Sequence, residues 1–324
     1  MIYASNLYEM NLIRPVERGC DLLKIVSGYS TAAMAFKHIN QGLGLNPNLR
    51  VQLIVGMCKN DGLSLSNHRG FNKLARDDFK GRFTCGYVFN NRPVHSKAYI
   101  WYQGSDFSTS YVGSANYTQN AFLGGNRELM VESKDIEICS YFEVIERDSI
   151  HCDDPEAEHL IQIYRDQRYR QLLKHQDEID DKGTVFPDEK RNLEHVRVSF
   201  LTKDGSLPGT SGLNWGQRER REKNQAYIPL KSDVYDSDFF PPTKMHFTIN
   251  TDDNKTLIAT RAQQNGKAIH TPHNNSLIGE YFRMRLGLPN GAFVQKEDLI
   301  RYGRTDVDFY KIDDETYYMD FSVG

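Results

Sequence analysis

The spacing of hydrophobic positions follows two different patterns along the chain, and the first pattern covers about 150 residues. Apolar runs at Leu22–Ser27 and Val51–Val55 are typical of buried strands, and Ala32–Ile39 between them has helical spacing. This order predicts a βαβ unit. Further strands are predicted at Cys85–Phe89, Ala98–Tyr102, Ser110–Gly113 and Glu128–Glu132, with a helix at Ile136–Glu146. The pattern indicates an α/β domain with a mostly parallel or mixed sheet.

A polar, helical pattern follows from Pro155 to about Asp181 and ends in an acidic, turn-prone stretch at 177–183. We interpret it as a helical acidic connector between two domains. The predicted organisation is therefore a first domain at 1–150, a connector at 151–189 and a second domain at 190–324.

Beyond residue 190 the rhythm changes to short strands separated by long loops, with one helix at Ser276–Leu286. A mostly-β segment of this kind predicts a small barrel. Its strands are expected at Val196–Leu201, Ala226–Leu230, Met245–Asn250, Thr256–Thr260, Val307–Ile312 and Thr316–Phe321. The helix carries Arg283 and Arg285, and we expect ordinary surface charge there, with one of the two exposed.

Composition is that of a soluble globular protein, with 39% hydrophobic and 26% charged residues. No apolar run approaches the roughly 18 residues of a membrane span, and the first residues lack the layout of a secretory signal. The five cysteines are an odd number without CxxC spacing. They indicate free thiols in a reducing cytoplasm, with neither disulfides nor zinc.

The net charge of −3 speaks at first against a nucleic-acid partner. The distribution of charge changes this picture. Residues 1–152 hold 16 Lys+Arg and 14 Asp+Glu, residues 153–189 hold 5 and 11, and residues 190–324 hold 19 and 18. The acid is concentrated in the connector, so the near-neutral flanking domains can still bind DNA if their basic groups gather on one face.

The strongest chemical signal is His95-Ser96-Lys97 at the start of a predicted strand. Alternate strand residues share a face, so His95 and Lys97 point to one site, as do Ser114 and Asn116 on the next strand. Glu128 opens the strand after that. An imidazole can attack phosphorus if a carboxylate orients its other nitrogen. Ammonium, hydroxyl and amide groups can hold the transition-state charge without a metal ion or other cofactor.

These motifs resemble the phospholipase D superfamily, whose signature is HxK followed by GSxN and a downstream Glu. The resemblance implies catalytic roles for His95, Lys97, Ser114, Asn116 and Glu128. The Asp usual in the superfamily five residues after the Lys is Tyr102 here, and Asp106 is the nearest carboxylate. This departure points to the divergent nuclease branch. A chain with one HxK implies, by resemblance, a homodimer with a shared active site.

Other histidines carry weaker signals. His68 lies in a polar segment, where a solvated loop is expected and a phosphate contact is the alternative. His151 is followed by Cys152, Asp153 and Asp154, but a charged connector explains this cluster better than metal ligands do. We therefore expect no metal site.

Two long segments of the second domain, 210–225 and 261–270, are rich in basic and amide side chains. Loops of this length are usually functional, and Arg, Asn and Gln read base edges in the major groove. The alternative is a pair of solvated surface loops. The candidate DNA-binding residues are Trp215, Gln217, Arg218, Arg221, Asn224, Arg261, Gln263, Asn265 and Lys267.

Four sequence segments in and after these loops carry a second resemblance: LNWGQR, NQAYIPL, NNSLIGEYFRMRLGL and DLIRYGRTDVDFYKID. With them, the chain resembles the NgoFVII family of type II restriction endonucleases over nearly its whole length. The resemblance implies a phospholipase D-like α/β nuclease domain and a DNA-recognition pseudobarrel similar to the plant B-three domain. Residues 210–225 would match its N-arm and 261–271 its C-arm. The enzyme would be bacterial and cytoplasmic, and would act on double-stranded DNA beside a cognate DNA methyltransferase.

Some members of that family act with a separate ATP-driven helicase-like subunit, and this chain has no GxxxxGK[ST] loop of its own. Two rival functions stay open at this point. One is a phosphodiesterase of the same superfamily acting on another substrate, such as a phospholipid. The other is a DNA-binding protein whose nuclease domain is inactive, although such a protein would be expected to lose His95 or Lys97.

Overall fold

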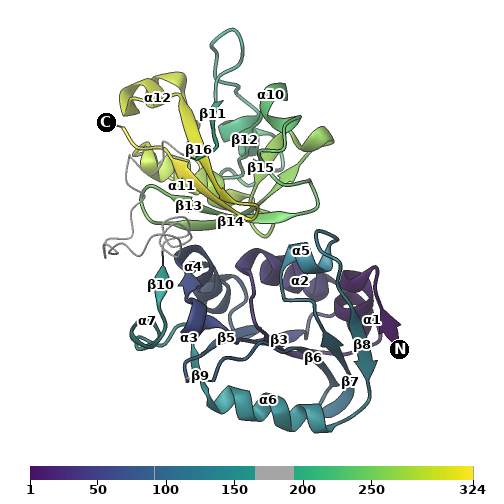
Figure 1. Ribbon diagram of the computed structural model, residues 1–324. Coiled ribbons are helices and arrows are strands. Elements are labelled where there is room, and N and C mark those ends of the chain that lie inside the picture. The colour runs from purple at the N-terminus through teal and green to yellow at the C-terminus, as the bar shows by residue number, and fades with distance from the viewer. Residues whose placement is uncertain (91, 165–192, 324) are drawn as a thin grey trace. The chain divides into compact units, whose positions relative to one another are not determined.

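The computed structural model describes residues 1–90, 92–164 and 193–323, which form two compact units (Figure 1). The chain passes from one unit to the other within residues 165–192. The predicted connector at 151–189 thus lies, from residue 165 onward, outside the described residues.

The first unit is built on a mixed eight-stranded sheet with the order β1-β8-β7-β6-β2-β3-β5-β9 among the described residues. Strands β2, β3 and β5 are parallel, and the other neighbours pair antiparallel. The strands are β1 (Ile2–Tyr3), β2 (Leu22–Ser27), β3 (Arg50–Val55), β5 (Phe83–Val88), β6 (Lys97–Gln103), β7 (Asp106–Gly113), β8 (Met130–Ser133) and β9 (Ser149–His151). This confirms the α/β fold class and the βαβ start.

Helices cover both faces of this sheet (Figure 1). Helix α2 (Ala32–Leu45) begins where Thr31 Oγ1 accepts from the Met34 amide at 3.3 Å, and it packs with α4 (Leu65–Lys73) on one face. Helix α6 (Glu137–Arg147) lies on the other face, where it buries Phe142. The remaining helices are η1 (Tyr8–Ile13), α1 (Arg14–Glu17), α3 (Cys58–Asp61), η2 (Leu74–Asp78), α5 (Gln119–Phe122) and α7 (Ala157–Leu160).

The described part of the predicted connector is held to the first unit. Helix α7 is followed by β10 (Ile163–Tyr164), which pairs parallel with β4 (Leu63–Ser64). Ala157 and Ile161 are buried there. The first unit therefore includes residues beyond 150.

The second unit is a seven-stranded sheet with the order β11-β16-β17-β13-β14-β15-β12 among the described residues. The first and last strands of that order approach each other, so the sheet nearly closes into the barrel that the sequence predicts. The strands are β11 (His195–Ser199), β12 (Ile228–Pro229), β13 (His246–Thr251), β14 (Thr256–Ala262), β15 (Ala268–His270), β16 (Asp306–Asp313) and β17 (Thr316–Asp320). Short helices are η3 (Gly212–Gln217), α10 (Ser232–Tyr235) and η4 (Gln264–Gly266). Phe247, Phe309 and Tyr317 form part of an aromatic core.

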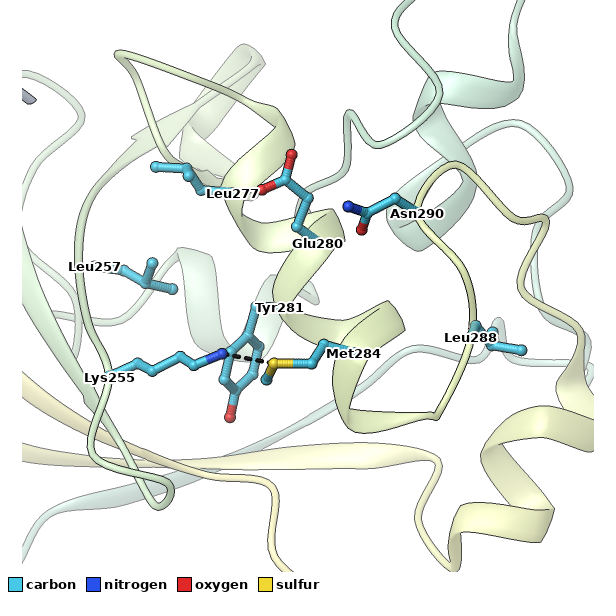
Figure 2. A pocket seen from close by; sticks show the side chains of 8 residues that line it. All are labelled: Lys255, Leu257, Leu277, Glu280, Tyr281, Met284, Leu288 and Asn290. Carbon is cyan, nitrogen blue, oxygen red and sulfur yellow. Dashed lines mark hydrogen bonds between the residues drawn. The ribbon is translucent and has the colours of Figure 1, made fainter. Parts of the chain in front are cut away.

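Two longer helices complete this unit, α11 (Ser276–Arg285), which the sequence predicted, and α12 (Lys296–Tyr302), which it did not. Helix α11 buries Ile278 and Phe282 in the barrel. Its other side faces a pocket of about 620 Å³ (Figure 2), where Lys255 Nζ donates to Met284 Sδ at 2.8 Å. The pocket lining comprises Lys255, Leu257, Leu277, Glu280, Tyr281, Met284, Leu288 and Asn290.

The prediction that one of the two arginines of α11 is exposed surface charge is wrong. Arg283 is fully buried and donates to the carbonyl oxygens of Ala292 at 2.7 Å and Leu213 at 3.2 Å. Arg285 is largely buried in a paired contact with Asp252 at 2.7 and 2.8 Å. Both guanidinium groups fix loops around the barrel, because a buried cation must find acceptors.

No helix among the described residues is long and apolar enough to cross a membrane.

Candidate active site

The five catalytic candidates meet at one edge of the first sheet because of strand register. Lys97 opens β6 beside Ser27 at the end of β2, and Ala98 pairs with Val112 near the end of β7. Gly113 in turn pairs with Met130, the first residue of β8. The start of β6, the end of β7 and the start of β8 therefore lie side by side. His95, Ser114, Asn116 and Glu128 occupy the loop residues next to these strand ends.

His95 and Lys97 form the centre of this site. The Lys97 ammonium lies 3.1 Å from His95 Nε2 and 3.2 Å from Nδ1, and it donates to the His95 carbonyl oxygen at 2.6 Å. An ammonium only donates, so a ring nitrogen bonded to it must present a lone pair. His95 is exposed, whereas Lys97 is buried. Burial lowers the pKa of Lys97 from its usual 10.5, and the negative charge of Glu128 acts in the opposite direction.

Asn116 adds an amide to the site. Its Oδ1 accepts from the Tyr29 backbone amide at 3.1 Å, which leaves the NH₂ end of the side chain to donate to a substrate oxygen. Gly28 makes the close approach possible. A Cβ on Gly28 would lie 3.0 Å from His95 Cδ2 and 3.5 Å from Asn116 Oδ1. The imidazole and the amide therefore flank the same glycine.

Ser114 and Glu128 form a second pair at this edge. Ser114 Oγ donates a short hydrogen bond to Glu128 and accepts from the Leu129 amide at 3.0 Å. Asn126 Nδ2 donates to the other oxygen of Glu128 at 3.4 Å. Among the described residues the Glu128 carboxylate has no hydrogen bond to His95, so the expected contact that would orient the imidazole is absent within one chain. Glu128 also precedes β8 by two residues and does not open it.

The expectation of a solvated loop around His68 is wrong. His68 lies in α4 and is buried, with Nδ1 3.1 Å from the Tyr87 hydroxyl and Nε2 3.2 Å from Glu158. Burial lowers the pKa of His68. Over the residues that the structure describes, no three His, Cys, Asp or Glu side chains gather in a way that could hold a metal ion, and His151 belongs to β9.

The first of the two predicted DNA-binding segments, 210–225, is a folded loop built around η3. Asn214 is buried and joins it to a neighbouring turn, because its side chain accepts from the Val294 amide at 2.9 Å and donates to the Val294 carbonyl at 2.8 Å. Asn224 is also buried and accepts from Gly291 N at 2.6 Å. Gln217 Nε2 donates to the Gly291 carbonyl at 3.1 Å. Gln217 and Asn224 therefore hold the loop in shape.

The exposed cations of this segment are Arg218, Arg220, Arg221 and Lys223, and Arg218 and Arg221 among them are the predicted base-reading residues. The guanidinium carbon of Arg221 lies 3.9 Å from the centre of the Trp215 ring, and its Nη1 donates to Gln225 at 3.1 Å. This stacking fixes the plane of the guanidinium while most of its donors stay free. Arg218 Nε donates to the Thr210 carbonyl at 2.7 Å.

In the second segment, Arg261 does not match the expectation of a free base-reading side chain. It lies in β14, is buried, and donates to the carbonyls of Gly266 and Asn265, each at 3.1 Å. These bonds support a tight turn in which Gln263 and Asn265 adopt φ values of 65° and 61°. Gln263, Asn265 and Lys267 are exposed on that turn.

Both units of the chain match domains of one protein family. The NgoFVII restriction endonuclease N-terminal PLD domain matches residues 5–159, and the NgoFVII C-terminal B3-like DNA-binding domain matches residues 188–313. The chain belongs to the NgoFVII restriction endonuclease family. It is a phosphodiester hydrolase with a phospholipase D-like nuclease domain, and its partner is double-stranded DNA.

Among solved structures, NucT from Helicobacter pylori is similar at 18% identity and a TM-score of 0.32, with 47% of this chain and 97% of NucT covered. Polyphosphate kinase from Porphyromonas gingivalis is similar at 13% identity and a TM-score of 0.30, with 54% of this chain and 28% of the kinase covered. A comparison with curated proteins found no match.

Sequence reasoning missed three residues that lie next to the candidate catalytic residues or hold such a neighbour, Gly28, Tyr29 and Asp61. The only signal was the segment Ser27-Gly28-Tyr29-Ser30 after a buried strand. A glycine at a strand end often marks a close approach of backbone or ligand. Asp61 comes from a separate segment, and its hydrogen bond with Tyr29 could be found only from coordinates.

Proposed function

We propose that this enzyme cleaves DNA at a specific sequence through a phosphohistidine formed on His95, without a metal ion, in an active site shared by two copies of the chain. The observation that carries the proposal is the contact between the Lys97 ammonium and the His95 ring nitrogens, with the Asn116 amide beside the same glycine. The ammonium disfavours protonation of the ring, and the neutral imidazole is the form that can attack phosphorus.

The first step forms a bond between His95 nitrogen and phosphorus and breaks the bond to the leaving oxygen of the DNA. An acid donates the proton that this oxygen needs. The second step is attack of water on the phosphohistidine, which releases His95 while the same acid, now a base, takes the proton of the water. Lys97 and Asn116 hold the non-bridging oxygens as charge develops on them. Ser114 joins them once its hydroxyl proton, which is given to Glu128 in the free enzyme, turns to the phosphate. Glu128 fixes Ser114 and supports the positive charge of Lys97.

The acid is assigned to a second His95, because the chain has one HxK motif. An exposed apolar row beside the site supports a homodimer. Ile2, Val131 and Val112 are neighbours across β1, β8 and β7, and they are 67%, 41% and 37% exposed. Leu129 extends this row next to Ser114 and is 46% exposed. A contiguous apolar surface of this kind is typical of an interface, and we call these four residues the apolar row.

The chemistry of the side chains already in place supports the proposed independence from metal ions. A divalent cation would neutralise charge on the phosphate oxygens and activate a nucleophile. Here the buried Lys97 ammonium supplies the charge and the imidazole is a nucleophile without activation by a metal.

The barrel is assigned the reading of the DNA sequence. Arg218 and Arg221 from the first segment, with Gln263, Asn265 and Lys267 from the second, present exposed donors suited to base edges and phosphates. Trp215, Gln217, Asn224 and Arg261 support these loops through the contacts described above. Protection of the host's own sites would fall to a cognate DNA methyltransferase, and an ATP-driven helicase-like subunit is proposed as a partner by analogy with other family members.

The test is to trap the intermediate. The enzyme is mixed with unmethylated plasmid in EDTA, and the cut ends are sequenced to find the site. Duplex oligonucleotides carrying this site, with ³²P at the scissile phosphate, are then quenched early in the reaction. We expect label on the protein that is stable to alkali, labile to acid and absent from His95→Ala. Cleavage that strictly requires added magnesium, or label that survives in His95→Ala, would contradict the proposal.

A further inference from the structure

Tyr29 forms a wall of the active site and is held more firmly than an exposed aromatic residue usually is. Its side chain is 42% exposed, yet its hydroxyl donates a short hydrogen bond to Asp61. Its backbone amide donates to Asn116 Oδ1 at 3.1 Å, and its carbonyl accepts from Ser27 Oγ at 2.7 Å. Both ends of the residue are therefore fixed.

The Tyr29 ring meets the imidazole of His95 edge to face, with ring centres 5.9 Å apart and planes at 78°. This is a favourable geometry for an aromatic pair. His95 is exposed, and in the described part of the chain its ring has hydrogen bonds only with Lys97. Tyr29 is thus an aromatic neighbour whose ring limits rotation of the imidazole.

Asp61 provides a fixed anchor for the Tyr29 hydroxyl. It is the last residue of α3, and the chain turns at Gly62 with a φ of 72°. A Cβ on Gly62 would lie 2.8 Å from the Gln162 carbonyl oxygen, so this turn is tightly packed. The hydrogen bond to Asp61 raises the pKa of Tyr29 to about 12, and the hydroxyl stays a donor at neutral pH. Exposed bonds of this kind add little to folding stability, which leaves a positional role.

We propose that Tyr29, tethered by Asp61, is a positioning residue that holds the His95 imidazole and the Asn116 amide in the geometry needed for attack on the phosphate. This inference rests on the proposed role of His95 as nucleophile. A direct contact of Tyr29 with DNA phosphate is disfavoured, because the hydroxyl proton is already given to Asp61 and the carboxylate would repel the phosphate.

A double-mutant cycle tests the tether. Tyr29→Phe, Asp61→Ala and the double variant are compared on the duplex that carries the mapped cleavage site, by single-turnover cleavage rate, dissociation constant and melting temperature. Each single change removes the same hydrogen bond, so we expect about a 5- to 10-fold loss of rate in each and no further loss in the double variant. Tyr29→Ala removes the ring too and should lose about 100-fold. Affinity for the duplex should stay within about 2-fold.

Controls separate this role from others. Tyr3 also donates to a carboxylate, that of Glu132 at 2.9 Å, but away from His95, so Tyr3→Phe should keep the wild-type rate. A wild-type rate in Tyr29→Ala, or losses that multiply in the double variant, would overturn the proposal. Loss of affinity in place of rate would do so as well, because it would mark a DNA contact. His95→Ala is assayed in parallel. If it still cleaves, the nucleophile itself is wrong, whereas a dead His95→Ala with a fully active Tyr29→Ala rejects only the positioning role.

Discussion

Gly28 faces the imidazole of His95 so closely that a methyl group on Gly28 would lie 3.0 Å from His95 Cδ2. Such a contact forces the neighbour to move by a few tenths of an ångström, and the exposed imidazole is the neighbour that can move. The position of the His95 imidazole therefore requires a residue without a side chain at position 28. It explains why a glycine stands between the end of β2 and Tyr29.

Gly28→Ala should slow cleavage by about 10- to 100-fold, because a displaced nucleophile loses the alignment needed for attack. Binding to the site should be unchanged, since the barrel lies in another part of the chain. Gly44→Ala is the matched control, because a Cβ there would meet no atom within 4 Å. Single-turnover rates of both variants decide the matter, and equal rates for the two would remove Gly28 from the site.

Replacing Glu128 with Gln should move the alkaline limit of the cleavage rate to lower pH. Burial already lowers the pKa of Lys97 from 10.5, and the charge of Glu128 partly offsets this shift. Without that charge the pKa of Lys97 falls further, so the ammonium is lost at a lower pH and with it the stabilisation of the transition state. The measurement is the single-turnover rate as a function of pH.

Glu132→Gln is the control for this experiment, since Glu132 bonds to Tyr3 and does not act on Lys97. Its alkaline limit should coincide with that of the wild type. An unchanged or raised limit in Glu128→Gln would show that the rate does not depend on the charge of Lys97 in the way argued above.

Much of this nuclease site follows from the sequence, because local rules determine it. Alternation along a strand brings His95 and Lys97 together, and the register of neighbouring strands adds Asn116. The Tyr29–Asp61 contact joins segments that no local pattern relates. Residue type also does not tell whether an arginine faces solvent or backbone carbonyls. Arg261 and Arg283 have the composition of a DNA contact or a surface charge, yet both are buried beneath the recognition loops.

Val131→Asp should separate the proposed homodimer, because it places a charge in the apolar row beside the catalytic residues. We expect a monomer by analytical ultracentrifugation that no longer cleaves but still binds its site through the barrel. Leu45→Asp is the comparison, since Leu45 is 48% exposed at the end of α2 and outside the apolar row. It should stay dimeric and active.

Mixed dimers test whether the two subunits share one active site. When one subunit carries His95→Ala, either the nucleophile or the acid is missing, so the heterodimer should be inactive or nearly so. A monomeric Val131→Asp variant that cleaves at the wild-type rate would refute the shared site.

Replacing Arg221 should change DNA binding, whereas replacing Arg261 should change folding stability, although both are arginines of the recognition loops. Arg221 is exposed on Trp215, and Arg221→Ala should weaken specific binding by about 1–3 kcal/mol if it reads a guanine, with little change in melting temperature. Arg261 is buried among backbone carbonyls, so Arg261→Met leaves several acceptors unpaired and should destabilise the second unit by about 3 kcal/mol. Binding titrations on specific and unrelated duplexes, with thermal unfolding of the same samples, measure both effects. Equal losses on the two duplexes would make Arg221 a phosphate contact, and a stable Arg261→Met that has lost only sequence preference would return Arg261 to the base-reading set.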